Sequence, residues 1–122
     1  MIGYVTLGTN NYDKSAKFYD ELFGSMGAKR VIEGDTFIAW STSESAPAVS
    51  IIKPYDGKKA TVGNGVMVAL VFDSTAKVDA LYKKAMALGA KDEGKPGLRG
   101  GNFYAAYFRD LDGNKLNAFC MA

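Results

Sequence analysis

The sequence of 122 residues contains no histidine. Histidine is the commonest protein ligand for transition metals, and it is the only side chain whose unperturbed pKa lies between about 5 and 8. Its absence excludes Ser-His-Asp triads, Cys-His dyads, HExxH zinc sites and the histidine-based triads of non-haem iron enzymes. Any general base would therefore be an Asp, Glu, Lys or Tyr with a shifted pKa.

Cysteine is almost absent as well. Cys120 is the single cysteine, so the chain forms no internal disulfide and carries no CxxC or cysteine-based zinc motif. We therefore expect a reducing compartment, the cytoplasm. The position of Cys120 between Phe119 and Met121 predicts a small buried side chain and not a nucleophile, because no histidine is available to activate it.

Long apolar runs and strong net charge are also missing. No segment approaches the roughly 20 apolar residues of a membrane helix, and the first residues do not resemble a signal peptide. The 15 basic residues are scattered and balance 13 acidic ones, which leaves a net charge of +2. We therefore expect neither membrane nor nucleic acid as a partner. The 48% of hydrophobic residues predicts one soluble domain that needs no disulfide or metal to fold.

The first half of the sequence predicts a strand, a helix and three more strands. Residues 2–7 are β-branched and aromatic and end in a turn cluster, which is typical of a short strand. A helix should follow, capped by Asn10 or Asn11 and ended by Gly27. Three short strands are then predicted at residues 28–33, 36–41 and 48–53.

The second half predicts the same order. Its expected strands are residues 66–72, 90–93, 102–109 and 115–121, with a helix between Ser74 as the cap and Gly89 as the end. Residues 94–101 are expected to form a glycine-rich loop. Residues 110–114 have the chemistry of a hairpin turn, and their spacing to Met121 does not fit a calcium-binding loop.

The ends of the two predicted helices match in sequence. Met26-Gly27-Ala28-Lys29 is echoed by Leu88-Gly89-Ala90-Lys91. Shared C-cap chemistry would account for the glycines, but the repeated order of strand, helix and Gly-Ala-Lys favours an internal repeat. We therefore predict an α+β protein of two βαβββ modules, at about residues 1–53 and 65–122, joined by a linker at about residues 54–64.

Several segments of this doubled pattern resemble the vicinal oxygen chelate superfamily, the glyoxalase, bleomycin resistance protein and dioxygenase group. The segments that carry the resemblance are residues 2–8, 15–19, 63–65 and 104–115. The resemblance implies a single domain in which the two tandem modules form a curved mixed sheet with a central cavity. It also implies a small-molecule ligand and a homodimer.

The metal ligands of the superfamily are not present at the corresponding positions. The resemblance places the two usual histidines at Tyr4 and Met67, the usual glutamate at Asn117 and a further ligand of some members at Ser50. All four side chains are neutral at pH 7 and are poor ligands for Zn, Ni, Mn or Fe. We therefore expect no metal and no cofactor.

Strand alternation indicates which side chains would line a pocket at these positions. Thr6 shares a face with Tyr4, Ala69 with Met67, and Phe119 with Asn117. Together with Ser50 and Trp40, the predicted pocket residues are Tyr4, Thr6, Trp40, Ser50, Met67, Ala69, Asn117 and Phe119. The same side chains could instead fill a collapsed core, and Trp40 would equally fit a dimer contact.

Three functions remain open on the sequence. The first is a metal-independent binding protein, similar to the bleomycin resistance proteins, that sequesters an aromatic or antibiotic-like ligand. The second is an enzyme, a glyoxalase-like lyase or isomerase or a dioxygenase-related protein. The third is a non-catalytic dimeric interaction module. Arg99, beside two glycines, could bind an anionic ligand, although a lone loop arginine is usually only solvated.

Overall fold

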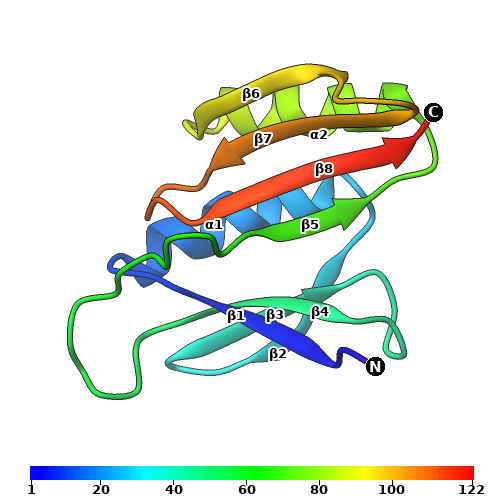
Figure 1. The fold of residues 1–122 in the computed structure, drawn as a ribbon. Coiled ribbons are helices and arrows are strands. Elements are labelled where there is room, and N and C mark those ends of the chain that lie inside the picture. Colours follow the sequence, from blue (N-terminus) through cyan, green and yellow to red (C-terminus); the bar gives the residue numbers. More distant parts are fainter. The chain divides into compact units, whose positions relative to one another are not determined.

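A computed structural model describes residues 1–122 as two compact units, Met1–Val62 and Gly63–Ala122. Each unit contains one helix and four strands in the order β-α-β-β-β (Figure 1). The predicted α+β class and the two tandem modules are therefore confirmed. Each unit holds its own four-stranded sheet. The joint curvature and the central cavity expected from the resemblance stay predictions.

The first unit has the strand order β1-β4-β3-β2. Strand β1 runs parallel to β4, and the other neighbouring pairs are antiparallel. The predicted elements all form, with ends that differ by one or two residues. Their bounds are β1 (Tyr4–Gly8), α1 (Tyr12–Gly24), β2 (Lys29–Glu33), β3 (Phe37–Ser41) and β4 (Ala48–Ile52).

The second unit repeats this topology. Its strand order is β5-β8-β7-β6, with β5 parallel to β8 and the other pairs antiparallel. The shared topology confirms the internal repeat. The bounds are β5 (Val68–Val71), α2 (Thr75–Ala87), β6 (Lys91–Leu98), β7 (Phe103–Arg109) and β8 (Lys115–Met121).

The two helices begin and end in the same way. The side chains of Asn11 and Ser74 each accept a hydrogen bond of 3.2 Å from the backbone N–H three residues later, which satisfies a donor of the first turn. Gly27 and Gly89 follow the helices with φ of 84° and 95°. In both cases the next alanine N–H bonds to the carbonyl five residues earlier, at 2.9 and 3.0 Å, which closes the helix end. Neither helix is long and apolar enough to span a bilayer.

Strand β6 is longer than the sequence predicts. It continues to Leu98, so the glycine-rich loop expected at residues 94–101 is wrong over its first five residues. The register of β6 on β7 shifts between Asp92 and Gly94 and again before Gly97. Bulges and an edge position let a strand accept glycine and proline, because the outward N–H needs no partner. Pro96 is therefore compatible with β6.

The hairpin of β7 and β8 is confirmed residue for residue, from Phe103 opposite Met121 to Arg109 opposite Lys115. Its turn is held by the Asp110 carboxylate. One oxygen accepts the backbone N–H groups of Asp112 and Asn114, both at 2.9 Å, and the other accepts the Asn114 amide at 3.0 Å. The turn interpretation of this segment is therefore correct.

In each unit the helix packs on one face of its sheet. In the first unit Trp40 contacts the rings of Tyr19 and Phe23 on α1, so Trp40 marks the covered face. In the second unit Tyr104 on β7 donates a hydrogen bond of 2.6 Å to Asp79 on α2. We call the opposite side of each sheet its helix-free face. The fully buried side chains of β7 and β8 on the α2 side are Ala106, Phe108, Leu116 and Ala118.

Candidate functional site

Three of the predicted pocket residues share the helix-free face of the first unit. Thr6 on β1 lies opposite Ser50 on β4, and Tyr4 lies two residues before Thr6 on the same strand. Ala39 on β3 continues the row of Thr6 and Ser50. The centre of this face is therefore built from small side chains, which leaves room above it for larger rings.

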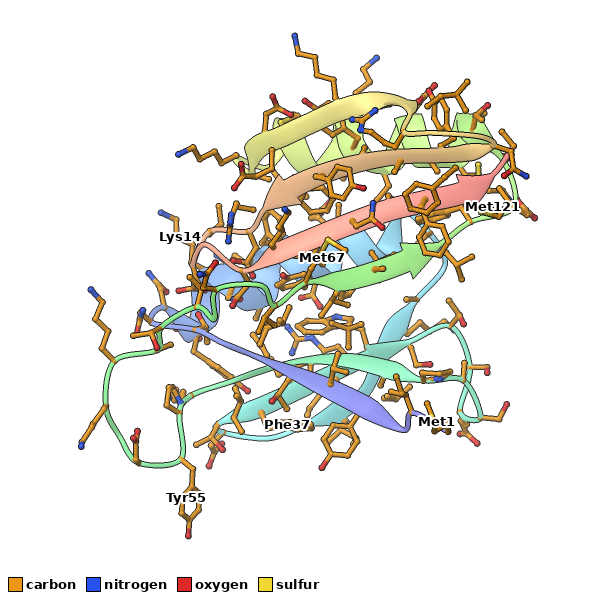
Figure 2. All side chains as sticks on the ribbon, in the orientation of Figure 1. Met1, Lys14, Phe37, Tyr55, Met67 and Met121 are labelled. Carbon is orange, nitrogen blue, oxygen red and sulfur yellow. The ribbon has the colours of Figure 1, made fainter.

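An aromatic pair lies on this face. The rings of Tyr4 and Phe37 meet edge to face, with centroids 5.8 Å apart. The Tyr4 side chain is 60% exposed. Phe37 is labelled in Figure 2, on the sheet of the first unit. The sequence prediction missed Phe37. Alternation along β3 nevertheless places it on the face opposite to that of Trp40, which follows three residues later.

Ser50 carries an unsatisfied polar atom at the centre of the same face. The residue is fully buried, and its hydroxyl oxygen has no hydrogen-bond partner. Leaving a buried hydroxyl unpaired costs about 1–3 kcal/mol. Buried polar atoms without partners are uncommon in folded proteins, which distinguishes Ser50 from the other residues of this face.

Trp40 does not join these residues. It lies on the face covered by α1, is only 2% exposed, and contacts Tyr19 and Phe23 at ring distances of 5.6 and 5.9 Å. Its indole N–H donates a hydrogen bond of 2.9 Å to Asp20 on α1. The structure therefore separates Trp40 from Tyr4, Thr6 and Ser50 and makes it part of the core between α1 and its sheet.

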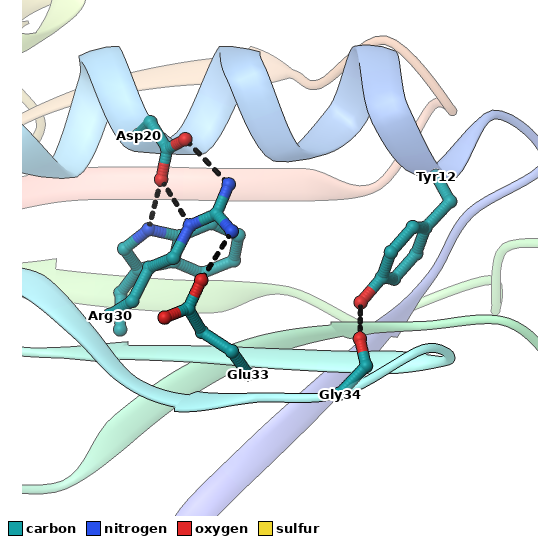
Figure 3. Close-up of polar contacts among 6 residues, drawn as sticks. Tyr12, Asp20, Arg30, Glu33 and Gly34 are labelled. Carbon is teal, nitrogen blue, oxygen red and sulfur yellow. Dashed lines mark hydrogen bonds and ion pairs between the residues drawn. The ribbon is translucent and has the colours of Figure 1, made fainter.

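An ion-pair cluster joins α1 to β2 beside Trp40 (Figure 3). Arg30 donates to both carboxylate oxygens of Asp20, at 2.8 and 2.7 Å, and to Glu33 at 2.8 Å. These bonds from Arg30 lower the pKa of Asp20, the partial burial of the carboxylate opposes that shift, and the bond from Trp40 lowers it further. In the same view Tyr12 donates a hydrogen bond to the carbonyl of Gly34. All these contacts are structural.

On the helix-free face of the second unit, three predicted residues lie together. Ala69 on β5 is opposite Asn117 on β8, and Phe119 follows two residues later on β8. Met67 lies outside the sheet, because β5 begins one residue later, at Val68. It is 40% exposed. The sequence prediction missed Tyr107, which lies opposite Asn117 on β7.

Asn117 is buried and its amide is already engaged. Its Nδ2 donates to the backbone carbonyls of Ala106 at 3.0 Å and Ala118 at 3.3 Å. These two bonds fix the orientation of the Asn117 side chain, which is a polar group among larger rings. Its strand, β8, is one of the two inner strands of the sheet. Phe103 and Phe119 form the ring pair of this face, with centroids 5.3 Å apart.

At the four positions where the resemblance places metal ligands, the residues do not fit a transition metal. Tyr4, Ser50 and Met67 offer a phenol, a hydroxyl and a thioether, and Asn117 offers only a neutral amide oxygen, since its nitrogen donates to backbone carbonyls. No group of three or more His, Cys, Asp or Glu side chains in the chain is arranged to hold a metal ion. A Lewis acid needs imidazole, thiolate or carboxylate donors, which these positions do not supply.

Comparison with known families decides the relationship. The model of the Glyoxalase/Bleomycin resistance protein/Dioxygenase superfamily matches residues 1–118. The chain belongs to this superfamily. A glyoxalase/bleomycin resistance protein from Albidiferax ferrireducens T118 is 32% identical, with a TM-score of 0.91 over 100% of this chain and 99% of that chain. A comparison with curated proteins gave no match.

More distant members of the superfamily share the fold. An enzyme of the glyoxalase/bleomycin resistance protein/dioxygenase family from Burkholderia phytofirmans PsJN has a TM-score of 0.80 at 18% identity, over 98% of each chain. A lactoylglutathione lyase from Agrobacterium tumefaciens has a TM-score of 0.73 at 18% identity, over 98% of this chain and 92% of that one. At these identities the likeness extends to the fold alone.

Proposed function

We propose that this superfamily member is a small-molecule-binding protein that holds an aromatic ligand without a metal. The observation that carries the proposal is an arrangement that both units share. Each helix-free face carries two contacting aromatic rings and one buried polar residue. The polar residue is the third residue of the strand that neighbours the edge strand β1 or β5. Ser50 holds that position in β4, and Asn117 holds it in β8.

This arrangement suits recognition better than a packed core. Binding sites for small molecules combine apolar and aromatic walls with a few fixed polar groups. The rings of Tyr4 and Phe37 are incompletely buried, as are those of Phe103 and Phe119, so each pair presents apolar surface to a ligand. The unpaired Ser50 hydroxyl and the oriented Asn117 amide supply the polar contacts.

A ligand panel tests the binding proposal. Thermal unfolding of the full chain is measured with planar aromatic compounds and with aliphatic compounds of similar size. A ligand that binds only the folded state at 100 times its Kd stabilises that state by about 2.7 kcal/mol, so the midpoint should rise for aromatic members alone. A flat response over a broad aromatic panel would overturn the proposal.

Elemental analysis tests the metal-free part of the proposal separately. Protein purified without chelators should contain far less than one Ni, Zn, Mn or Fe per chain, and EDTA should leave its ligand-induced thermal shifts unchanged. Stoichiometric metal, or loss of the shifts in EDTA, would contradict metal independence while leaving ligand binding intact.

The enzyme alternative depends on donors that this chain lacks at the family positions. A lyase assay with methylglyoxal and glutathione, repeated with added Ni²⁺ or Zn²⁺, should show no turnover above the uncatalysed rate. Turnover that follows added metal would favour the glyoxalase-like alternative instead.

We also propose that the protein forms a homodimer. Strand β5 is an edge strand. Three apolar residues on β5 or just before it are exposed to solvent: Val66 by 60%, Met67 by 40% and Val71 by 70%. An edge with exposed apolar residues favours pairing with another chain. Sedimentation equilibrium of the full chain should give twice the mass of 13.1 kDa, and a monomer at all concentrations would contradict this part.

A further inference from the structure

Arg99 is held over the helix-free face of the second unit by the backbone of β6. Its guanidinium lies 5.6 Å from the centroid of the Tyr107 ring and donates to the carbonyl of Lys95. Two glycines make this position available. A Cβ on Gly94 would lie 3.2 Å from one Arg99 nitrogen and 3.0 Å from the Tyr107 ring, and a Cβ on Gly97 would lie 3.0 Å from the other terminal nitrogen.

A second cation lies against the same ring. Lys115 Nζ is 5.3 Å from the Tyr107 centroid. Neither Lys115 nor Arg99 forms an ion pair, whereas the neighbouring Arg109 is paired with Glu93. Glu93 interacts electrostatically with Lys115, but its carboxylate is bound by Arg109, which together with Lys115 keeps its pKa low. The helix-free face therefore carries two cations around Tyr107 without bound counter-charges of their own.

On β8 the polar and aromatic groups of this face continue from Lys115 in one line. On β8 the side chains of Lys115, Asn117 and Phe119 point to the helix-free side at successive alternate positions, about 7 Å apart. Phe103 contacts Phe119 at the far end. A ligand lying along β8 would thus meet Lys115 at one end, an amide at its middle and aromatic rings at the other end. The Arg99 guanidinium lies to one side of this line, over Gly94 and Gly97 of β6 and against the Tyr107 ring.

We propose that the helix-free face of the second unit recognises an aromatic carboxylate. The carboxylate lies beside Tyr107, where Arg99 and Lys115 approach the ring, and the ring system of the ligand lies against Phe103 and Phe119. Arg99 matches a carboxylate because its fork of donors binds both oxygens. This inference rests on the proposed binding function and adds the charge and polarity of the ligand to it.

The test compares two probes that differ in charge. Binding of 1-naphthoate and of its neutral isostere 1-naphthamide to the full chain is measured by calorimetry at constant ionic strength. We expect naphthoate to bind about tenfold tighter than naphthamide, because only the carboxylate can form a charge-assisted bidentate contact with Arg99. R99Q and K115Q should each reduce this preference, while K83Q, which removes the same charge from the exposed side of α2, should not.

G97A tests the positioning of Arg99 without changing any charge. The added methyl group would lie 3.0 Å from an Arg99 nitrogen, so the guanidinium has to shift by a few tenths of an ångström. The preference for naphthoate should therefore fall while the unfolding midpoint stays near that of the wild type. A preference that survives both R99Q and G97A would overturn the proposal.

The same experiment separates this inference from the proposed function. If naphthamide and naphthoate bind equally, the anion site is refuted and aromatic binding stands. If neither binds but other aromatic members of the panel do, this inference is again refuted alone. If no aromatic compound binds, both proposals fail.

Discussion

Arg30 holds Asp20 in a bidentate ion pair, with Nε and Nη2 at 2.8 and 2.7 Å from the two carboxylate oxygens. Trp40 adds a third hydrogen bond to the same carboxylate, at 2.9 Å. One side chain of α1 is thus bound by two neighbouring strands, β2 and β3. This fixes the position of the helix along and across its sheet, which apolar packing alone does not specify.

Removal of the Asp20 charge should destabilise the protein moderately. Asp20 and Arg30 are 41% and 31% exposed, so solvent screens the pair, and we expect D20N to lose about 1 kcal/mol in urea unfolding. D20A should lose roughly 1–2 kcal/mol more, because the buried Trp40 N–H then has no acceptor. D73N breaks a more exposed ion pair, with Lys77, and should change stability negligibly. Equal losses in D20N and D20A would contradict the role of the indole bond.

The contribution of Asp20 should depend on pH. The bonds from Arg30 lower its pKa in the folded state below the unfolded value of about 3.9. Its stabilisation is therefore present above about pH 4 and is lost as the pH falls through the folded pKa. The difference in unfolding free energy between wild type and D20N should be constant from pH 7 to about pH 5 and shrink at lower pH. A difference that grows on acidification would show that the shift has the opposite sign.

Two glycines near the end of α1 should respond to alanine in opposite directions. Gly27 has a φ of 84°, a left-handed conformation that costs other residues about 1–2 kcal/mol, so G27A should be destabilised by that amount. Gly24 is the last helical residue, and a Cβ there would contact nothing within 4 Å. G24A should gain about 0.4–1 kcal/mol from the lower entropy of the unfolded chain. Thermal unfolding of the two variants measures both, and a loss in G24A would show that its site is constrained.

Ser50 should affect binding and stability in different ways. Its hydroxyl is buried without a partner, so S50A removes an unsatisfied group and should leave the unfolding midpoint unchanged or raise it. For ligands that bind the helix-free face of the first unit, the thermal shift of S50A should be smaller than that of the wild type, because the variant has no hydroxyl to bond the ligand. The two readouts come from one titration of ligand into each variant. A clear loss of stability without ligand would show that the hydroxyl has a structural partner.

Local signals were sufficient to predict most of the fold. The caps at Asn11 and Ser74, the stops at Gly27 and Gly89 and the turn after Arg109 all act within a few residues, so the sequence displays them directly. Strand β6 was the exception. Its glycines and Pro96 have the composition of a loop, and they are tolerated only because the strand lies at an edge and contains bulges.

The candidate site was less predictable because it depends on which face each strand presents. Alternation along β1 placed Thr6 on the face of Tyr4, and the resemblance to the superfamily placed Ser50 with them. The pattern of β3 alone did not show that Trp40 faces α1, since the face covered by α1 is set by tertiary packing. Arg99 lay in a segment expected to be a solvated loop, and its contact with Tyr107 depends on the unpredicted strand beneath it.

Trp40 and Cys120 give each unit a probe of its own. The only tryptophan lies in the first unit and the only thiol in the second, and both are 2% exposed. Each becomes accessible only when its own core opens, so acrylamide quenching of the indole and disulfide exchange at the thiol report on different halves of one unmodified chain. The two rates, measured together in denaturant, reveal whether the repeated modules open as one cooperative unit or separately.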